Sequence, residues 1–393
     1  MTVISVKPIP VFSWRRGWPL ALLALLPLLV LWWWPRRPAA DAAAWQETRQ
    51  FAAPERLPAA GGNVPAVTFD STRLRGVSWV GSDSITAAEL EPLCQTHVSW
   101  IAQTPFGWQA GAAAPAVRMH TARPGGRGGL WGESDAGLVY TARLARQRRI
   151  HTLLKPHLWV LGNNSWPGDI NMNSAADWDA WFASYSTFML HYAQLAETAH
   201  FDGLCIGTEL LHATEPVHEK AWRGLIKQIR RLYHGPLTYA ANWSGEYQQI
   251  RFWDALDYVG VQAYFPLSSA ASPPLDTLLR GWQPHLRALA AWQKKINKPI
   301  VFTEIGYKTP PDAAARPWEW PEYMATLNTP DEATQARCYE AMFRACWGLP
   351  WLKGMFIWKW YPGLKADGPA RRHADFTPQH KPAEAVLARW YGQ

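Results

Sequence analysis

The chain has 393 residues, of which 48% are hydrophobic and 18% are charged, and its formal net charge is +8. This length and apolar content exclude a disordered or fibrous protein and are enough for one large hydrophobic core or two ordinary ones. Residues 1–68 hold seven Lys or Arg against three Asp or Glu, so the remaining 325 residues carry a net charge of only +4. Because no basic run alternates with aromatic residues either, we expect no nucleic-acid partner.

Tryptophan is unusually frequent, since 26 Trp accompany 13 Tyr and 13 Phe. Part of this content is explained by the core, because aromatic side chains bury the most apolar area per residue. The remainder favours a carbohydrate ligand, since the flat C–H faces of sugar rings stack on indole rings. Core packing alone is the alternative interpretation.

Residues 17–35 form an uncharged stretch of 19 residues between two Arg pairs, with the sequence GWPLALLALLPLLVLWWWP. A helix of this length just spans a hydrocarbon core of about 30 Å, and its final tryptophans match the aromatic belt of a membrane interface. The length favours an uncleaved transmembrane anchor, because the apolar region of a signal peptide is usually about 7 to 15 residues long. A signal peptide cleaved near the small residues 40–42 is the alternative.

This segment divides the chain into a short flank (1–16), the transmembrane or signal segment (17–35), an Ala- and Pro-rich linker (36–68) and a folded domain (69–393). In both interpretations we expect the folded domain to lie outside the cytoplasm, in the periplasm or the extracellular space. It is membrane-anchored through the N-terminal helix if the segment is retained, and secreted if the segment is cleaved. We expect the protein to be a monomer.

The four cysteines contain no C-x-x-C pair, so the sequence offers no zinc or redox motif. Cys338 and Cys346 lie eight residues apart in a stretch with a helical pattern, which separates them by about 12 Å and excludes a disulfide between them. We interpret these two residues, together with Cys94 and Cys205, as small buried apolar side chains. An extracytoplasmic location would permit one disulfide bond, whose two cysteines the sequence does not identify.

Eight short runs rich in β-branched and aromatic residues predict strands at residues 75–81, 97–103, 150–160, 203–209, 237–243, 258–265, 299–307 and 354–360. Helical patterns alternate with them at residues 86–95, 135–149, 175–200, 217–233, 275–296, 330–347 and 382–391, with a short, weak one at 246–256. Eight such units predict an α/β fold, the (β/α)8 barrel. A doubly wound open sheet is the alternative, but it would need a Gly-rich first turn that this chain lacks.

Two carboxylates stand out at the expected C-terminal ends of the strands, where barrels of this kind carry their active sites. Glu209 and Glu304 each follow an apolar run, on the fourth and seventh strands. A purely structural carboxylate there would need a dedicated partner such as Lys155 or Lys359, because an unpaired buried charge is costly. We favour hydrolysis of a glycosidic bond, in which one carboxylate is the nucleophile and the other the acid and then the base, about 5 to 5.5 Å apart in a retaining enzyme.

Six segments at the expected strand ends form an ordered set. They read LKPHLWV (154–160), GTEL (207–210), LTYAANW (237–243), VQAYFPL (261–267), FTEIGY (302–307) and IWKWYP (357–362). Together they resemble glycoside hydrolase family 113, within the large clan of (β/α)8 retaining glycosidases. The resemblance covers residues 69–393.

The resemblance implies an acid/base role for Glu209, a nucleophile role for Glu304, and a retaining, endo-acting hydrolase whose characteristic substrate is β-1,4-mannan. One residue departs from the pattern of the clan. The residue before the acid/base is commonly an Asn that contacts the sugar 2-hydroxyl, and here it is Thr208. The choice between mannose and other sugars therefore stays open.

Neighbouring strand-end residues are assigned to the substrate on chemical grounds. They are Tyr264, Trp360, Asn242, Trp243, His157, Lys155, Trp358 and Thr208. Tyr264 can donate its hydroxyl to Glu304, with a core tyrosine as the alternative. The tryptophans can stack on sugars or only pack, His157 and Lys155 can bond hydroxyl groups, and Asn242 can bond a hydroxyl group or cap the following turn.

A metal site is not expected. His212, Glu215 and His218 have the spacing of ligands on a helix, but Pro216 interrupts the helix that they would need. We therefore expect a glycosidase without metal or cofactor that acts on a polysaccharide or oligosaccharide. A catalytically inactive carbohydrate-binding or cell-envelope module on the same barrel is the alternative, since this fold hosts many functions.

Overall fold

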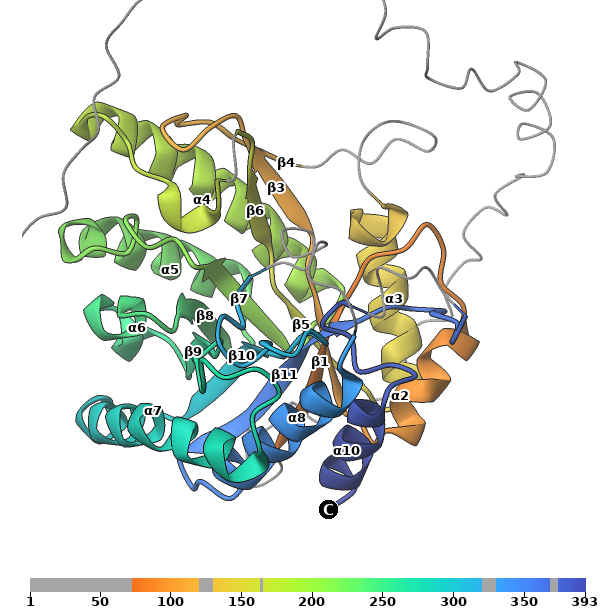
Figure 1. The fold of residues 1–393 in the computed structure, drawn as a ribbon. Coiled ribbons are helices and arrows are strands. Elements are labelled where there is room, and N and C mark those ends of the chain that lie inside the picture. Colours follow the sequence, from red (N-terminus) through yellow and green to blue (C-terminus); the bar gives the residue numbers. More distant parts are fainter. Residues whose placement is uncertain (1–72, 120–129, 163–164, 320–329, 368–373) are drawn as a thin grey trace, which may run out of the picture. The chain divides into compact units, whose positions relative to one another are not determined.

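The computed structural model describes residues 73–119, 130–162, 165–319, 330–367 and 374–393, all within one unit of the chain, Val67–Gln393. Eight parallel strands close into a barrel in the order β1-β11-β10-β9-β8-β7-β5-β2 (Figure 1). They are β1 (Leu74–Trp79), β2 (Trp100–Gln103), β5 (His151–Leu154), β7 (Gly203–Thr208), β8 (Leu237–Asn242), β9 (Val259–Gln262), β10 (Ile300–Ile305) and β11 (Leu352–Trp360). The predicted (β/α)8 barrel is confirmed.

Helices surround the barrel (Figure 1). They are α2 (Glu91–Gln95), α3 (Asp135–Gln147), α4 (Ala175–Thr198), α5 (Glu219–Leu232), α6 (Glu246–Gln249), α7 (Leu275–Ile296), α8 (Glu332–Cys346) and α10 (Pro382–Tyr391). In the described part of the chain, short 3-10 helices join them: η2 (Ala87–Leu90), η3 (Trp131–Glu133), η4 (Pro167–Asp169), η5 (Pro216–His218) and η6 (Trp253–Ala255). The weak fifth helical pattern corresponds to one turn, α6, followed by η6.

Local signals explain where several helices begin and end. Ser134 and Ser174 accept hydrogen bonds from backbone N–H groups in the first turns of α3 and α4, which satisfies donors that otherwise lack a partner. Asn297 ends α7 in the left-handed conformation, which asparagine adopts more readily than most residues. These three helix ends therefore follow from short-range chemistry.

The hydrophobic core has two parts, because side chains alternate between the two faces of each strand. One cluster fills the barrel interior and contains Leu74, Trp100, Ala102, Leu153, Cys205, Ala240, Tyr258, Val301 and Phe356. A larger cluster lies between the strands and the helices. Cys205, Cys338 and Cys346 are buried free thiols, as interpreted from the sequence, whereas Cys94 is partly exposed and also free.

The run at residues 150–160, predicted as one strand, is in fact two. The barrel strand β5 ends at Leu154, and β6 (His157–Val160) pairs instead with β3 (Phe106–Gln109). Pro156 lies at the break, and a proline cannot donate to a sheet ladder. With β4 (Val117–Met119) these strands form a separate sheet, in the order β4-β3-β6, that lies beside α4 in Figure 1.

The predicted transmembrane or signal segment, residues 17–35, lies outside the described residues, as do the flank 1–16 and the linker 36–68. Within the described part of the chain, no helix is long and apolar enough to cross a membrane. The extracytoplasmic location stays a prediction.

Candidate active site

Glu304 lies on β10, is 4% exposed, and both of its carboxylate oxygens accept hydrogen bonds. The Lys155 ammonium donates to Oε1, and the Tyr264 hydroxyl donates to Oε2 at 2.8 Å. Lys155 is itself fully buried and also donates to the backbone oxygen of Thr303, at 3.3 Å. Burial alone would raise the pKa of Glu304, but the charge and hydrogen bond of Lys155 outweigh it and lower that pKa below 4.5. Glu304 is therefore ionised at neutral pH.

His157 Nε2 lies 3.6 Å from Glu304 Oε1, and its ring stacks against Trp358 with the centroids 6.3 Å apart. Burial and the nearby Lys155 charge lower the pKa of His157 to about 3. The imidazole is therefore neutral at physiological pH and can act as a hydrogen-bonding group rather than as a cation.

Glu209 is the first residue after β7 and remains partly exposed. Its backbone has a φ of +51°, and its Oε1 accepts a hydrogen bond of 2.7 Å from the Asn242 side-chain amide. Burial, followed by the negative charges of Glu304 and Glu246, raises the pKa of Glu209 to about 8. Glu209 is therefore mainly protonated at neutral pH, whereas Glu304 is ionised. Two carboxyl groups whose pKa values are separated in this way can serve as acid and nucleophile at one site.

A further carboxylate, the fully buried Glu246 at the first position of α6, supports Glu209, and sequence reasoning did not identify it. Its side chain accepts hydrogen bonds from the Tyr239 hydroxyl at 2.6 Å, the Thr214 hydroxyl at 3.0 Å and the Asn242 backbone N–H at 2.6 Å. Asn242 in turn holds the Glu209 carboxyl group, and the Tyr239 hydroxyl accepts a bond of 2.7 Å from the N–H of Leu210. Glu246 therefore fixes both the carboxyl group and the backbone that follows it.

An aromatic wall stands next to Glu304, formed by Tyr264, Trp358 and Phe376 with Trp243 packed against it. The ring of Phe376 lies edge-on to that of Tyr264, with the centroids 6.1 Å apart. This contact places Phe376 behind the tyrosine that donates to Glu304.

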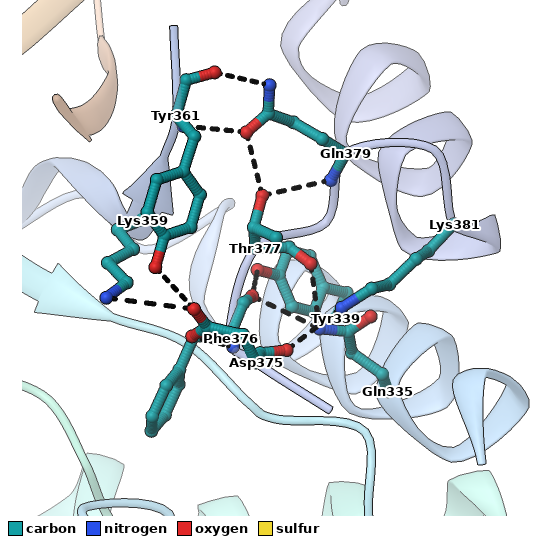
Figure 2. A network of polar contacts seen from close by, with 9 residues as sticks. All are labelled: Gln335, Tyr339, Lys359, Tyr361, Asp375, Phe376, Thr377, Gln379 and Lys381. Atoms are coloured by element: carbon teal, nitrogen blue, oxygen red, sulfur yellow. Dashed lines mark hydrogen bonds and ion pairs between the residues drawn. The ribbon is translucent and has the colours of Figure 1, made fainter. Parts of the chain in front are cut away.

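A polar network secures the segment that carries Phe376 (Figure 2). Gln335 Nε2 donates to the Phe376 oxygen at 3.1 Å, and Lys381 Nζ donates to the Asp375 oxygen at 2.9 Å. The Asp375 carboxylate accepts from the Tyr361 hydroxyl and lies 3.7 Å from Lys359 Nζ. Lys359, one of the two lysines considered as partners for a structural carboxylate, therefore pairs with Asp375, and Lys155 pairs with Glu304.

Three residues that the sequence assigns to the substrate contact other protein groups in the structure. Lys155 is assigned to a substrate hydroxyl by the sequence, but its buried ammonium is bound to Glu304. Trp360 is 1% exposed and packs in the main core, whereas Trp358 clusters with Tyr264, which donates to Glu304, and stacks against His157. Asn242 uses its amide N–H on Glu209, and its Oδ1 accepts from Ser244 N–H at 2.7 Å, which is the turn-capping alternative.

Several buried polar atoms at the ends of the barrel strands have no hydrogen-bond partner among the described residues. They are Ser78 Oγ, both amide atoms of Gln103, His157 Nε2 and Thr208 Oγ1. Buried polar groups are nearly always paired with protein or ordered water. These groups are therefore candidates to bind sugar hydroxyls, and Ser78 and Gln103 add to the set assigned from the sequence.

Trp243 lies farther along the aromatic wall, with its ring centroid 5.3 Å from that of Trp318, which is 42% exposed.

Comparison with known proteins agrees with this geometry. The model of Glycoside Hydrolase Family 113 matches residues 67–381. A solved GH113 β-1,4-mannanase is 25% identical, with a TM-score of 0.69, and the match covers 82% of this chain and 100% of that one. The GH113 β-mannanase AaManA from Alicyclobacillus acidocaldarius, solved in complex with ManMIm, is 28% identical, with a TM-score of 0.68 and coverage of 82% and 98%.

More distant relatives share the fold alone. A β-glucuronidase from Ruminococcus gnavus is 12% identical, with a TM-score of 0.51, and the match covers 81% of this chain and 49% of that one. No match was found among the curated proteins compared. The match of the family model across the barrel and its site confirms the resemblance: the chain belongs to glycoside hydrolase family 113 and is a glycoside hydrolase.

Proposed function

We propose that the protein hydrolyses β-1,4-linked mannan or manno-oligosaccharides with retention of configuration, using Glu304 as nucleophile and Glu209 as acid and base. The observation that carries this proposal is the different surroundings of two carboxyl groups at the barrel mouth: Glu304 accepts from the Lys155 ammonium and the Tyr264 hydroxyl, whereas Glu209 accepts only from the neutral Asn242 amide among the described residues. The Lys155 charge holds the pKa of Glu304 down, whereas burial and nearby negative charges raise that of Glu209 to about 8. Retaining glycosidases need this combination.

In the first step, a carboxylate oxygen of Glu304 attacks the anomeric carbon, and Glu209 gives its proton to the glycosidic oxygen, which leaves with the other part of the chain. In the second step, the Glu209 carboxylate takes a proton from water. The resulting attack of the water oxygen on the anomeric carbon breaks the bond to Glu304 and restores both groups. The hydrogen bonds from Lys155 and Tyr264 orient Glu304 for the first step.

The choice of mannan rests on the relatives, because the two family members that we compared are described as mannanases. Local chemistry is compatible with a sugar in this place. Trp358 and Trp243 supply aromatic faces, and Gln103 and Thr208 supply buried polar atoms without partners in the described chain. We also propose that the enzyme acts outside the cytoplasm, on the basis of the apolar stretch at residues 17–35.

The test is release of reducing ends by the full-length chain from β-mannan, glucomannan, xylan, β-glucan and chitosan. We expect the wild-type chain to hydrolyse mannan and glucomannan. The rate of hydrolysis should fall at least about a thousandfold in Glu304→Ala and in Glu209→Ala, because each variant lacks a group that takes part in the reaction. Glu91→Gln, a change of an exposed carboxylate on α2, is the matched control. Binding of mannan by the wild-type chain without hydrolysis would contradict the proposal.

A further inference from the structure

The sheet formed by β3, β4 and β6 has one face packed on the molecule and one face of aromatic rings. In the parallel pairing of β3 with β6, Phe106 lies opposite His157, and Trp108 lies opposite Trp159. Because side chains alternate along a strand, these four rings share one face. We call them the aromatic platform.

The other face of the same sheet is buried against α4. The Trp181 indole donates to Gln109 Oε1 at 2.9 Å, and a Cβ atom at Gly107 would lie 2.6 Å from the Phe188 ring. Helix α4 therefore fixes the sheet at a close distance and sets the direction in which the platform faces.

The rings of the platform form a continuous series that begins at the catalytic carboxylate. His157 lies 3.6 Å from Glu304, and its ring centroid is 5.4 Å from that of Phe106. Trp159 follows at 6.0 Å from Phe106, and Trp108 lies 6.1 Å from Trp159. Trp159 is 52% exposed, which is unusual for so large an apolar ring and typical of an interaction site when other rings adjoin it.

Aromatic rings also stand on the opposite side of the barrel mouth. In the closed order of strands, β10 lies four strands from β5, and β9 lies four strands from β2. Trp318 follows β10, which lies opposite β5, and its ring centroid is 5.3 Å from that of Trp243, which follows β8. A polymer that crosses the two carboxylates can therefore meet rings on both sides.

We propose that the aromatic platform binds sugar units of the substrate chain beyond the two that flank the cleaved bond. This inference rests on the proposed hydrolysis of a β-1,4-linked polysaccharide. The occupant is a carbohydrate and not a protein segment because the platform continues directly from a residue in contact with the nucleophile. These four side chains carry no charge at neutral pH, and Arg118 of β4, which lies opposite Trp108 on the same face, can donate to sugar hydroxyls.

The experiment compares mannohexaose with mannotriose, since only the longer chain reaches across the platform. For the full-length Trp159→Ala variant, we expect the ratio of kcat/KM on the hexaose to that on the triose to fall about tenfold relative to wild type, which corresponds to about 1.4 kcal/mol. Trp159→Phe keeps a ring and should recover most of this ratio. Tyr140→Ala removes a ring that is 38% exposed on α3, outside the platform, and should leave the ratio at the wild-type value.

An unchanged ratio in Trp159→Ala, with an active wild type, would overturn the platform and leave the proposed function standing. If the wild-type chain hydrolyses neither oligosaccharide, the proposed function fails, and binding of mannohexaose is measured by calorimetry instead. Weaker binding by Trp159→Ala than by wild type would then support the platform, whereas equal binding, or none by wild type, would overturn it.

Discussion

Replacing Lys155 by methionine tests what keeps Glu304 ionised. The lysine is fully buried with its ammonium on the carboxylate, so K155M removes that charge and keeps an apolar side chain of similar length. The attraction of two unit charges about 4 Å apart is worth about 4 kcal/mol at an effective dielectric constant of about 20. At about 1.4 kcal/mol for each tenfold change in an equilibrium constant, its loss makes protonation of Glu304 up to about a thousandfold more favourable at a given pH and so raises the pKa of that group.

The pH dependence of kcat/KM should report this change directly. Only ionised Glu304 attacks, so the acidic limb moves up to higher pH. The alkaline limb, which follows Glu209, also moves up, because the Lys155 charge lowers the pKa of that group as well. The assay is hydrolysis of mannohexaose from about pH 4 to 10, where K155M should lose activity at a higher pH than wild type as the pH falls.

A second buried lysine provides the control for K155M. Lys308 is 1% exposed, and its ammonium donates to the backbone oxygens of Arg316 and Glu319 at 3.1 and 3.2 Å. We expect K308M to lower stability without moving the acidic limb. An acidic limb that stays at its wild-type position in K155M would refute the idea that Lys155 sets the ionisation of Glu304.

Three further variants probe the groups around the carboxylates. E246Q should move the alkaline limb of the pH profile to lower pH, because the Glu246 charge raises the pKa of Glu209. It should also lower Tm, since one buried donor loses its acceptor at a cost of about 1–3 kcal/mol. An alkaline limb at the wild-type position would contradict this role of Glu246. Y264F should lower kcat about 10- to 100-fold, as expected for a hydrogen bond to the charged Glu304, and should also lower Tm, because the buried carboxylate loses a donor. A kcat within about twofold of wild type would count against this role of Tyr264. Q103L should lower kcat/KM without reducing the free energy of unfolding, because the Gln103 amide has no partner in the described chain; loss of stability in urea would disprove that view.

The barrel is predictable because each βα unit has a local pattern. Helices α7 and α10 span the same residues as the predicted helices, and every predicted strand overlaps a barrel strand. The separate sheet of β3, β4 and β6 was not predictable from local sequence patterns. It pairs β3 with β6, two segments distant in sequence, and the break at Pro156 that releases β6 from the barrel is hidden inside one apolar run.

The two carboxylates are also predictable, since each is a charged residue after an apolar run and the strand ends of a barrel meet at one mouth. Their supporting contacts are not. Lys155 reaches Glu304 from β5 to β10, two strands that face one another only once the barrel has closed. Glu246 gathers its hydrogen bonds from segments after β7 and around β8, so nothing in its own neighbourhood in the sequence distinguishes it from a surface residue.

The stereochemistry of the first product tests the central claim most directly. Proton NMR of mannohexaose hydrolysis, recorded before mutarotation, identifies the anomer released at the new reducing end. Attack by ionised Glu304, followed by water activated at Glu209, predicts that the β-anomer appears first and the α-anomer later. Initial release of the α-anomer would mean a single displacement by water and would contradict the role of Glu304 as nucleophile.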